Sequence, residues 1–324
     1  MSIVRRSVLI CLSVPLVCSA VAAASSAEGV VKVFLLAGQS NMEGKGAVNT
    51  LAWLGEDERH GHLLKAIQTE DGQWREGDDV WIDYFGRRGK LGVGYGSKGG
   101  PHGPRIGPEY GFGMVVGEQF EEPVLLVKAA WGGKDVANDF RAPGSGGPGE
   151  FYTRTVEHLE SVLANLDDHF PELAGRTPEI AGIVWFQGWN DMVNAEKRGA
   201  YTANLAQMLR DLRRDIGCPD CPVIIGELGA GGDKPSRNVA DFRKAQAAVA
   251  KMPEFNGQVR FVETAKFWDP IAQKMYDEDV WKGDDKARFY RIASDRPYHY
   301  LGSGKIYFLM GHAFGTEMIE AVTK

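Results

Sequence analysis

Residues 30–44 read VVKVFLLAGQSNMEG, and this stretch decides how the rest of the chain is interpreted. Its first eight residues form a short apolar run rich in valine and leucine, which is typical of a buried strand. Gly38 ends the run where a strand of an α/β sheet would turn into a helix, and reactive groups of such sheets gather at the carboxyl ends of strands. Ser40 is therefore expected where a nucleophile would be presented, although a Ser after a Gly is more often a turn or helix-capping residue.

Four more apolar runs of strand length follow, at residues 124–130, 180–186, 223–228 and 259–263. Amphipathic helical patterns are interspersed with them, at residues 151–166, 195–216, 238–251 and 306–322. Strands that alternate with helices favour a parallel sheet covered by helices on both faces. We therefore expect a single α/β domain, a three-layer α/β/α sandwich around a five-stranded parallel sheet. No internal repeat and no linker rich in proline and serine divides the sequence.

The first 24 residues have the pattern of a secretory signal peptide. Arg5 and Arg6 precede an apolar stretch from Ser7 to Val21, which is short for a membrane span, and Ala-x-Ala cleavage sites follow it. The alternative is an uncleaved membrane anchor. We expect a signal peptide at residues 1–24 and one domain at residues 25–324, secreted or periplasmic and without stable membrane association after cleavage.

The amino-acid composition excludes few classes of function, but together with the motifs it limits the kinds of partner and cofactor to be expected. A hydrophobic content of 44% and a charged content of 25% are ordinary for a globular protein, and the net charge of −6 gives no reason to expect a nucleic-acid partner. No phosphate-binding glycine motif and no His, Cys, Asp or Glu cluster with metal-ligand spacing occurs, so we expect no cofactor and no metal. The oligomeric state stays open.

Of the four cysteines, Cys11 and Cys18 lie within the expected signal peptide. Cys218 and Cys221 form a C-x-x-C pattern, which can be a redox motif, half of a zinc site or a small disulfide. The sequence has no second C-x-x-C, and the pattern precedes an expected strand. In an oxidising compartment a structural disulfide is the favoured interpretation.

Polar clusters follow the second and third apolar runs, and another lies near the C-terminus. They read AAWGGKD at residues 129–135, WFQGWND at 185–191 and SDRPYHYLGS at 294–303. With Ser40, these clusters offer a hydroxyl, a glycine pair, side-chain amides and an Asp close to a His. A serine hydrolase needs a nucleophile, a base, an acid that orients the base, and donors for the oxyanion.

The motif GQSNM at residues 38–42 resembles the first block of the SGNH hydrolases, and more closely that of their sialate O-acetylesterase-like branch of carbohydrate acetylesterases. The A-x-G-G, W-x-Q-G and late His of that branch match Ala130–Gly133, Trp185–Gly188 and His299 in the same order. The resemblance implies a three-layer fold. It also implies a secreted serine esterase that removes O-acetyl groups from carbohydrates, either sialate or plant or algal polysaccharide, through an acyl-enzyme.

The resemblance implies that Ser40 is the nucleophile, His299 the general base and Asp295 the acid that orients it. Among seven histidines, only His299 lies in a loop just before a final helix and close to an Asp. The superfamily has D-x-x-H in its last block, whereas Arg296 stands three residues before His299 here. Asp295 is one residue further away, so Asp191 remains a rival for the same role.

The expected oxyanion donors are the Ser40 amide, an amide near Gly133, and the side chain of Asn190, Gln187 or both. The branch often has an acidic residue after its Q-G, but Trp189 stands there. Residues 188–191, GWND, instead resemble the G-x-N-D block of the wider superfamily, whose Asn is a donor. The choice between Asn190 and Gln187 stays open.

Gln39 and Asn41 in the first block and Glu109 in a G-P-E segment are expected to bind substrate, although Glu109 could instead cap the following helix. Residues 45–122 read as a long, glycine-rich insertion, which we expect to form an active-site wall with sugar-stacking aromatics. The alternative is that the aromatics pack the insertion onto the domain. These residues are Trp53, Trp74, Trp81, Tyr84, Tyr95 and Tyr110.

Two other functions compete with a carbohydrate esterase. The first is a catalytically weak carbohydrate-binding protein of the same fold, supported by the shifted Asp295. The second is another SGNH activity, such as a lipase or thioesterase, against which the polar and aromatic character of residues 45–122 weighs.

Overall fold

A computed structural model of the chain describes residues 29–100 and 102–323. The expected signal peptide, with Cys11 and Cys18, lies outside these ranges. Within them, no helix combines the length and the apolar character needed to cross a membrane.

The domain is built on one seven-stranded sheet with the strand order β4-β3-β6-β1-β7-β8-β9. All strands are parallel except β4, which pairs antiparallel with β3 at one edge. The expected α/β architecture and its five parallel strands are confirmed, and the sheet has two strands more than expected. Its strands are β1 (Val30–Gly38), β3 (Val80–Tyr84), β4 (Arg87–Lys90), β6 (Val124–Ala130), β7 (Thr177–Phe186), β8 (Val223–Gly226) and β9 (Val259–Val262).

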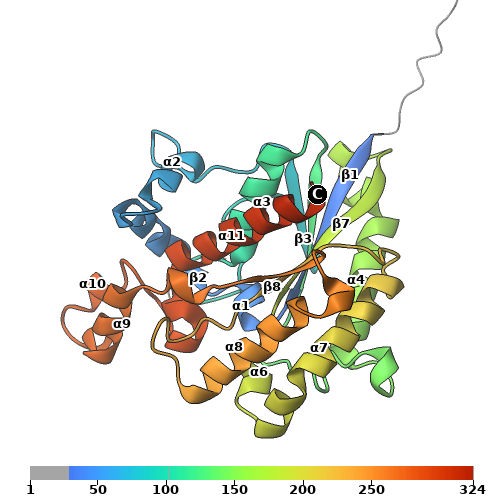
Figure 1. Cartoon of the computed structure of the whole chain (residues 1–324). Helices are drawn as coiled ribbons and strands as arrows, with labels where there is room; N and C mark the ends of the chain where they lie inside the picture. The colour runs from blue at the N-terminus through green and yellow to red at the C-terminus, as the bar shows by residue number, and fades with distance from the viewer. Residues whose placement is uncertain (1–28, 101, 324) are drawn as a thin grey trace, which may run out of the picture.

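Helices cover both faces of the sheet and make the three layers visible in Figure 1. Side chains of a strand alternate between the two faces, so β1 sends Val33 and Leu35 into one core and Phe34 and Leu36 into the other. The first core packs against α4 (Glu150–Ala164), α7 (Ala195–Asp215) and α8 (Arg237–Ala250), and the second against α3 (Pro108–Gln119) and α11 (Gly304–Val322). The four expected helices are all present.

Residues 45–122 are more regular than expected, because part of the segment belongs to the main sheet and to one of its covering helices. They supply β3, β4 and α3, and a small second sheet of β2 (Gly46–Ala47) and β5 (Arg105–Ile106). Three of the aromatics expected to stack on sugar are buried: Trp81, Tyr84 and Tyr110. The alternative, that these rings pack the segment onto the domain, holds for them.

Short helical turns complete the chain around the sheet. A third apolar cluster beside the loop before α11 is built partly from α9 and α10. The turns are α1 (Ser40–Glu43), η1 (Val48–Glu56), η2 (Gly61–Leu63), α2 (Leu64–Ile67), η3 (Pro143–Ser145), α5 (Leu166–His169), η4 (Pro171–Leu173), α6 (Trp189–Met192), η5 (Pro253–Phe255), η6 (Ala265–Phe267), α9 (Pro270–Asp277), η7 (Val280–Lys282), α10 (Lys286–Phe289) and η8 (Pro297–Gly302).

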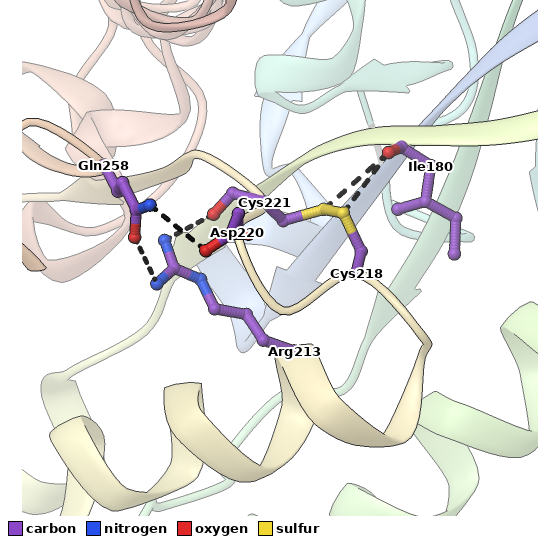
Figure 2. The surroundings of a disulfide bond; sticks show 6 residues. All are labelled: Ile180, Arg213, Cys218, Asp220, Cys221 and Gln258. Atoms are coloured by element: carbon purple, nitrogen blue, oxygen red, sulfur yellow. Dashed lines mark hydrogen bonds between the residues drawn. A yellow bond between two sulfur atoms is a disulfide. The ribbon is translucent and has the colours of Figure 1, made fainter.

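Cys218 and Cys221 form a disulfide in the turn between α7 and β8 (Figure 2). Arg213 of α7 donates a hydrogen bond to the Cys221 carbonyl and another to Gln258, which in turn donates to Asp220. The disulfide therefore belongs to a locally braced turn at the amino end of β8, as the structural interpretation of the C-x-x-C pattern requires. It lies at the opposite end of that strand from the carboxyl edge of the sheet.

Candidate active site

Ser40 lies at the carboxyl end of β1, in the middle of the sheet. A side chain at Gly38 would collide with β7, because an added Cβ would lie 2.1 Å from the Phe186 carbonyl oxygen. The absence of a side chain at Gly38 therefore lets the ends of β1 and β7 come together. Gln39 is extended, and Ser40 begins the short helix α1 with 9% of its surface exposed.

The structure brings Ser40, His299 and Asp295 into one hydrogen-bonded chain. Ser40 Oγ lies 3.1 Å from His299 Nε2, and His299 Nδ1 lies 3.1 Å from Asp295 Oδ2. Burial favours a higher pKa for Asp295, but hydrogen bonds from His299 and the Arg296 amide outweigh it and hold the pKa below its usual range. An ionised carboxylate thus faces the imidazole, whose other nitrogen faces the hydroxyl.

An unusual backbone conformation sets the spacing of Asp295 and His299. Tyr300, Leu301 and Gly302 are consecutive left-handed residues with φ of 49°, 58° and 62°. The Leu301 carbonyl turns back to accept the Asp295 amide at 3.0 Å, which closes the loop. Because of this turn, a His four residues after the Asp reaches its carboxylate, so the departure from D-x-x-H does not separate the two side chains.

Gln39 and Asn41 point into the protein and do not fit the expected role in substrate binding. Gln39 Oε1 accepts the Gly188 amide at 3.0 Å, which ties α1 to the end of β7. Asn41 donates to the Tyr298 carbonyl at 3.2 Å and accepts from the Tyr307 hydroxyl at 2.7 Å. Both side chains are buried, and they fasten the loops that present Ser40 and His299.

Glu109 is fully buried, so the expectation that it binds substrate is also wrong. Its carboxylate forms a 2.7 Å ion pair with Lys128 and accepts the Gly107 amide at 2.8 Å, just before α3. Lys128 also donates to the Glu43 carbonyl at 2.9 Å, at the end of α1. Burial lowers the pKa of Lys128, while Glu109 opposes this effect. The pair anchors the turn that follows the serine.

Asp191 does not take the place of Asp295. Its carboxylate accepts the Val136 amide at 3.0 Å, the Ala137 amide at 3.3 Å and Gln187 Nε2 at 2.6 Å. Burial raises the pKa of Asp191 to about 6, although these hydrogen bonds oppose the shift. The contacts attach the loop after β6 to the end of β7, so Asp191 positions that loop.

The two side-chain amides after β7, those of Gln187 and Asn190, differ in whether an N–H donor remains free. Gln187 uses both amide hydrogens, donating to the Lys134 carbonyl at 3.0 Å and to Asp191 at 2.6 Å. Asn190 donates one hydrogen to the Gly133 carbonyl at 2.8 Å, which leaves its second hydrogen available. The geometry favours Asn190 over Gln187 as an oxyanion donor, with Gly133 beside it.

Two pairs of aromatic rings, which were not expected as site residues from the sequence, lie around the site. Tyr298, 40% exposed, lies against Trp189 with ring centroids 5.3 Å apart and against His299 at 4.5 Å. In the second pair, Phe85 lies against Trp131 with ring centroids 4.7 Å apart. Trp131, Trp189 and Tyr298 each lie within one or two residues of an expected site residue, so their position in the sequence could have indicated that they border the site. Phe85 has no such signal.

One part of residues 45–122, around β5, lies close enough to Asp295 to act on it electrostatically. The positive charge of Arg105 helps to keep the pKa of Asp295 low. His102, in the loop before β5, stacks on Tyr290 with ring centroids 4.2 Å apart. In the part of the chain that the structure describes, no group of three or more His, Cys, Asp or Glu side chains could hold a metal ion.

The chain is similar in sequence to a probable carbohydrate esterase and in structure to a carbohydrate acetylesterase. The chain is 25% identical over 217 residues to the probable carbohydrate esterase At4g34215 of Arabidopsis thaliana, covering 62% of this chain and 70% of the relative. The crystal structure of that plant protein superposes with a TM-score of 0.56 at 17% identity, covering 89% of this chain and 98% of the other.

A carbohydrate acetylesterase from Xanthomonas citri superposes with a TM-score of 0.51 at 16% identity, covering 90% of this chain and 56% of the other. Both superpositions support the fold. The model of one protein family matches residues 30–266, which include the strands β1, β6 and β7 and the polar clusters that follow them. The chain therefore belongs to the carbohydrate esterase family described as sialic acid-specific acetylesterase.

Proposed function

We propose that this protein is a serine esterase that removes O-acetyl groups from carbohydrates through an acyl-enzyme. The observation that carries the proposal is the hydrogen-bonded chain from Ser40 Oγ through His299 to Asp295, with 3.1 Å at each step. This is the arrangement in which an imidazole removes a hydroxyl proton while a carboxylate stabilises the resulting imidazolium.

In the first half of the reaction, His299 Nε2 takes the proton of Ser40 as Oγ attacks the acetyl carbonyl carbon. The Ser40 amide, the Gly133 amide and Asn190 Nδ2 are the proposed donors to the oxyanion, and losing one such donor typically costs about 3 kcal/mol. The C–O bond to the sugar then breaks, and the sugar hydroxyl leaves with the proton from His299. Water, deprotonated by His299, hydrolyses acetyl-Ser40 to acetate and free enzyme.

We also propose that the protein is secreted or periplasmic. Two features support this: the signal-peptide pattern of residues 1–24 and the pairing of Cys218 with Cys221, since disulfides persist in oxidising compartments. The alternative of a catalytically weak binding protein rested on the spacing of Asp295 and His299. It loses that support, because the left-handed turn at Tyr300–Gly302 brings the two side chains together.

The test compares the wild-type protein with Ser40→Ala on p-nitrophenyl acetate, acetylated xylan, acetylated pectin fragments and O-acetylated sialic acid. Wild type should release acetate from at least one of the carbohydrates, and Ser40→Ala should fall to background with an unchanged melting temperature. A folded Ser40→Ala that keeps most of its activity would end the serine-esterase proposal. Wild type that releases no acetate from any carbohydrate would end the assignment of the substrate class.

A further inference from the structure

A pocket of about 410 Å³ opens beside the helical turn that carries Ser40. Glu43, three residues after Ser40 on that turn, contributes to its wall. Side chains three residues apart on a helix are neighbours, so Glu43 links the pocket wall to the turn that presents Ser40. Glu43 also adjoins the proposed oxyanion loop, because a Cβ added to Gly132 would lie 3.2 Å from Glu43 Oε2.

The pocket is positively charged in a chain whose net charge is −6. Lys45, Arg87 and Lys98 line it together with a single carboxylate, that of Glu43, which pairs with Lys45 at 2.8 Å. Within residues 29–100 and 102–323, no carboxylate lies within ion-pair distance of Arg87 or Lys98. Two cationic side chains in the pocket wall are thus without an anionic partner from this part of the chain.

Arg87 is held in place by neutral groups. Its guanidinium donates to the Gly94 carbonyl at 3.2 Å and to the Gly96 carbonyl at 2.8 Å, and it lies over the Tyr84 ring at 4.6 Å. These contacts orient the cation without neutralising its charge. A fixed, uncompensated guanidinium in a pocket wall is suited to bind a carboxylate.

Phe85 adds an apolar surface to the same pocket. It forms, with Gly86, the two-residue turn between β3 and β4, and both have positive φ, 51° and 80°. Such turns prefer Asn-Gly, and a bulky side chain with positive φ is an outlier of the kind that clusters at ligand-binding sites. The ring is 42% exposed and lies against Trp131, the residue before Gly132, so it connects the pocket to the oxyanion loop.

We propose that this pocket is a subsite for an acidic sugar residue of the substrate, with Arg87 and Lys98 facing its carboxylate and Phe85 against its ring. The inference rests on the proposed esterase function and names the substrate class within it: an acetylated glycan that carries a carboxylate. A uronic acid and a sialic acid offer this same group, and the experiment separates them.

The first experiment measures acetate release by the wild-type protein from matched pairs of substrates. One pair is O-acetylated oligogalacturonides with free or methyl-esterified carboxyl groups, and the other is O-acetylated sialic acid and its methyl ester. The free acid of one pair should have a kcat/KM about tenfold higher than its methyl ester, and added salt should reduce this ratio by screening the charges. The pair that shows the ratio identifies the source of the carboxylate. A ratio near one for both pairs would overturn the inference.

Variants test whether the pocket produces the ratio. Lys98→Gln and Arg87→Gln should each lower it severalfold, mainly through a higher KM for the acid. Lys90→Gln is the matched control, since Lys90 is an exposed lysine on the same hairpin outside this pocket, and it should keep the wild-type ratio. An equal effect of all three variants would mean that the ratio comes from the overall surface charge and not from this pocket, which would contradict the inference.

Phe85→Asn removes the ring while suiting the turn. It should raise the KM for the acidic oligosaccharide severalfold and leave the melting temperature unchanged or higher. A lower melting temperature with an unchanged KM would mean that the ring is only structural, and would remove Phe85 from the subsite.

Failure of the inference can be told from failure of the proposed function. Calorimetric binding of oligogalacturonides and of sialic acid, both without acetyl groups, to Ser40→Ala requires no ester hydrolysis. Binding of either that is weakened at least severalfold by adding Lys98→Gln supports the subsite even where no activity is found. If the protein releases acetate but shows neither this binding nor a higher kcat/KM for the free acids than for their methyl esters, the proposed subsite is contradicted and the proposed esterase function stands.

Discussion

Two loops at the carboxyl edge of the sheet each carry an Asp that could orient His299, Asp295 as the expected residue and Asp191 as its rival, and the two carboxylates differ in their partners. In the loop before α11, the Asp295 carboxylate faces His299 at 3.1 Å and has a lowered pKa. In the loop after β7, Asp191 is surrounded by backbone amides and Gln187, and burial raises its pKa to about 6. Asp191 has no imidazole among its partners and holds a loop in place, whereas Asp295 accepts from His299 as well as from the Arg296 amide and can therefore orient the imidazole and stabilise its protonated form.

Among the variants that test this contrast, Asp295→Asn should have the largest effect on the rate. The Asn amide would present a donor to His299 Nδ1 and favour the wrong ring tautomer, and we expect kcat to fall roughly 10³- to 10⁴-fold. The measurement is hydrolysis of p-nitrophenyl acetate, with thermal unfolding as the control for an intact fold. A loss of less than tenfold in a folded protein would mean that Asp295 is peripheral and would remove the contrast with Asp191.

Asp191→Asn should show the opposite balance, with a smaller effect on rate and a larger one on stability. An Asn side chain has one acceptor oxygen, so at least one of the Val136, Ala137 and Gln187 donors loses its partner, at a cost of about 1–3 kcal/mol. Displacement of the Gly133 loop should lower kcat by about 10- to 100-fold, less than loss of an oxyanion donor at full strength. Urea unfolding and the same ester assay check both values. A kcat lower than that of Asp295→Asn would reverse the assignment.

Gly302→Ala tests whether the left-handed turn sets the position of Asp295. An added Cβ would lie 2.7 Å from the Asp295 Cβ, and φ there is +62°. Gly175→Ala is a matched control, since Gly175 has φ of +76° and open space around the added atom. Each variant should lose about 1–2 kcal/mol from its backbone conformation. Only Gly302→Ala should also lower kcat, by about tenfold from a misplaced catalytic group. Equal activities would show that the turn does not position the carboxylate.

The smallest predicted effect concerns pH and the raised pKa of Asp191. Because the folded pKa of about 6 exceeds the unfolded value, the folded state binds the proton more tightly between about pH 4 and pH 6. Protonation of Asp191 therefore adds stability as pH falls from 7 to 5, by about 1 kcal/mol. Asp191→Asn lacks this contribution, so the free-energy difference between wild type and variant should grow by that amount. A constant difference would contradict the raised pKa.

The sequence predicted those parts of the molecule whose patterns are local. The runs that became β1, β6 and β7 are continuous and apolar because both of their faces are buried, and the polar residues that follow them meet at one edge. Strand β3 was missed because its five residues include Asp83, which is buried and bonded to the Gly86 amide. Val80, Trp81, Ile82 and Tyr84 are residue types that favour strands, so the pattern held a signal that the interruption by Asp83 and the glycine-rich surroundings obscured.

The side chains beside the serine could not be assigned from the motif. Gln39 and Asn41 flank Ser40, yet they point inward to Gly188 and Tyr307, partners that are distant in sequence. The left-handed turn was equally hidden, because Tyr300 and Leu301 are residue types that rarely adopt it. Buried packing of both side chains holds the turn, and such packing depends on the whole fold.

The most direct test of the central claim is to trap the nucleophile. The wild-type protein is treated with a fluorophosphonate, and intact-mass and peptide mass spectrometry locate the adduct. We predict one adduct per chain, on Ser40, formed far more slowly in His299→Ala because the hydroxyl loses its base. A wild-type protein that hydrolyses esters but carries its adduct on another residue, or carries none while remaining active, would contradict the account.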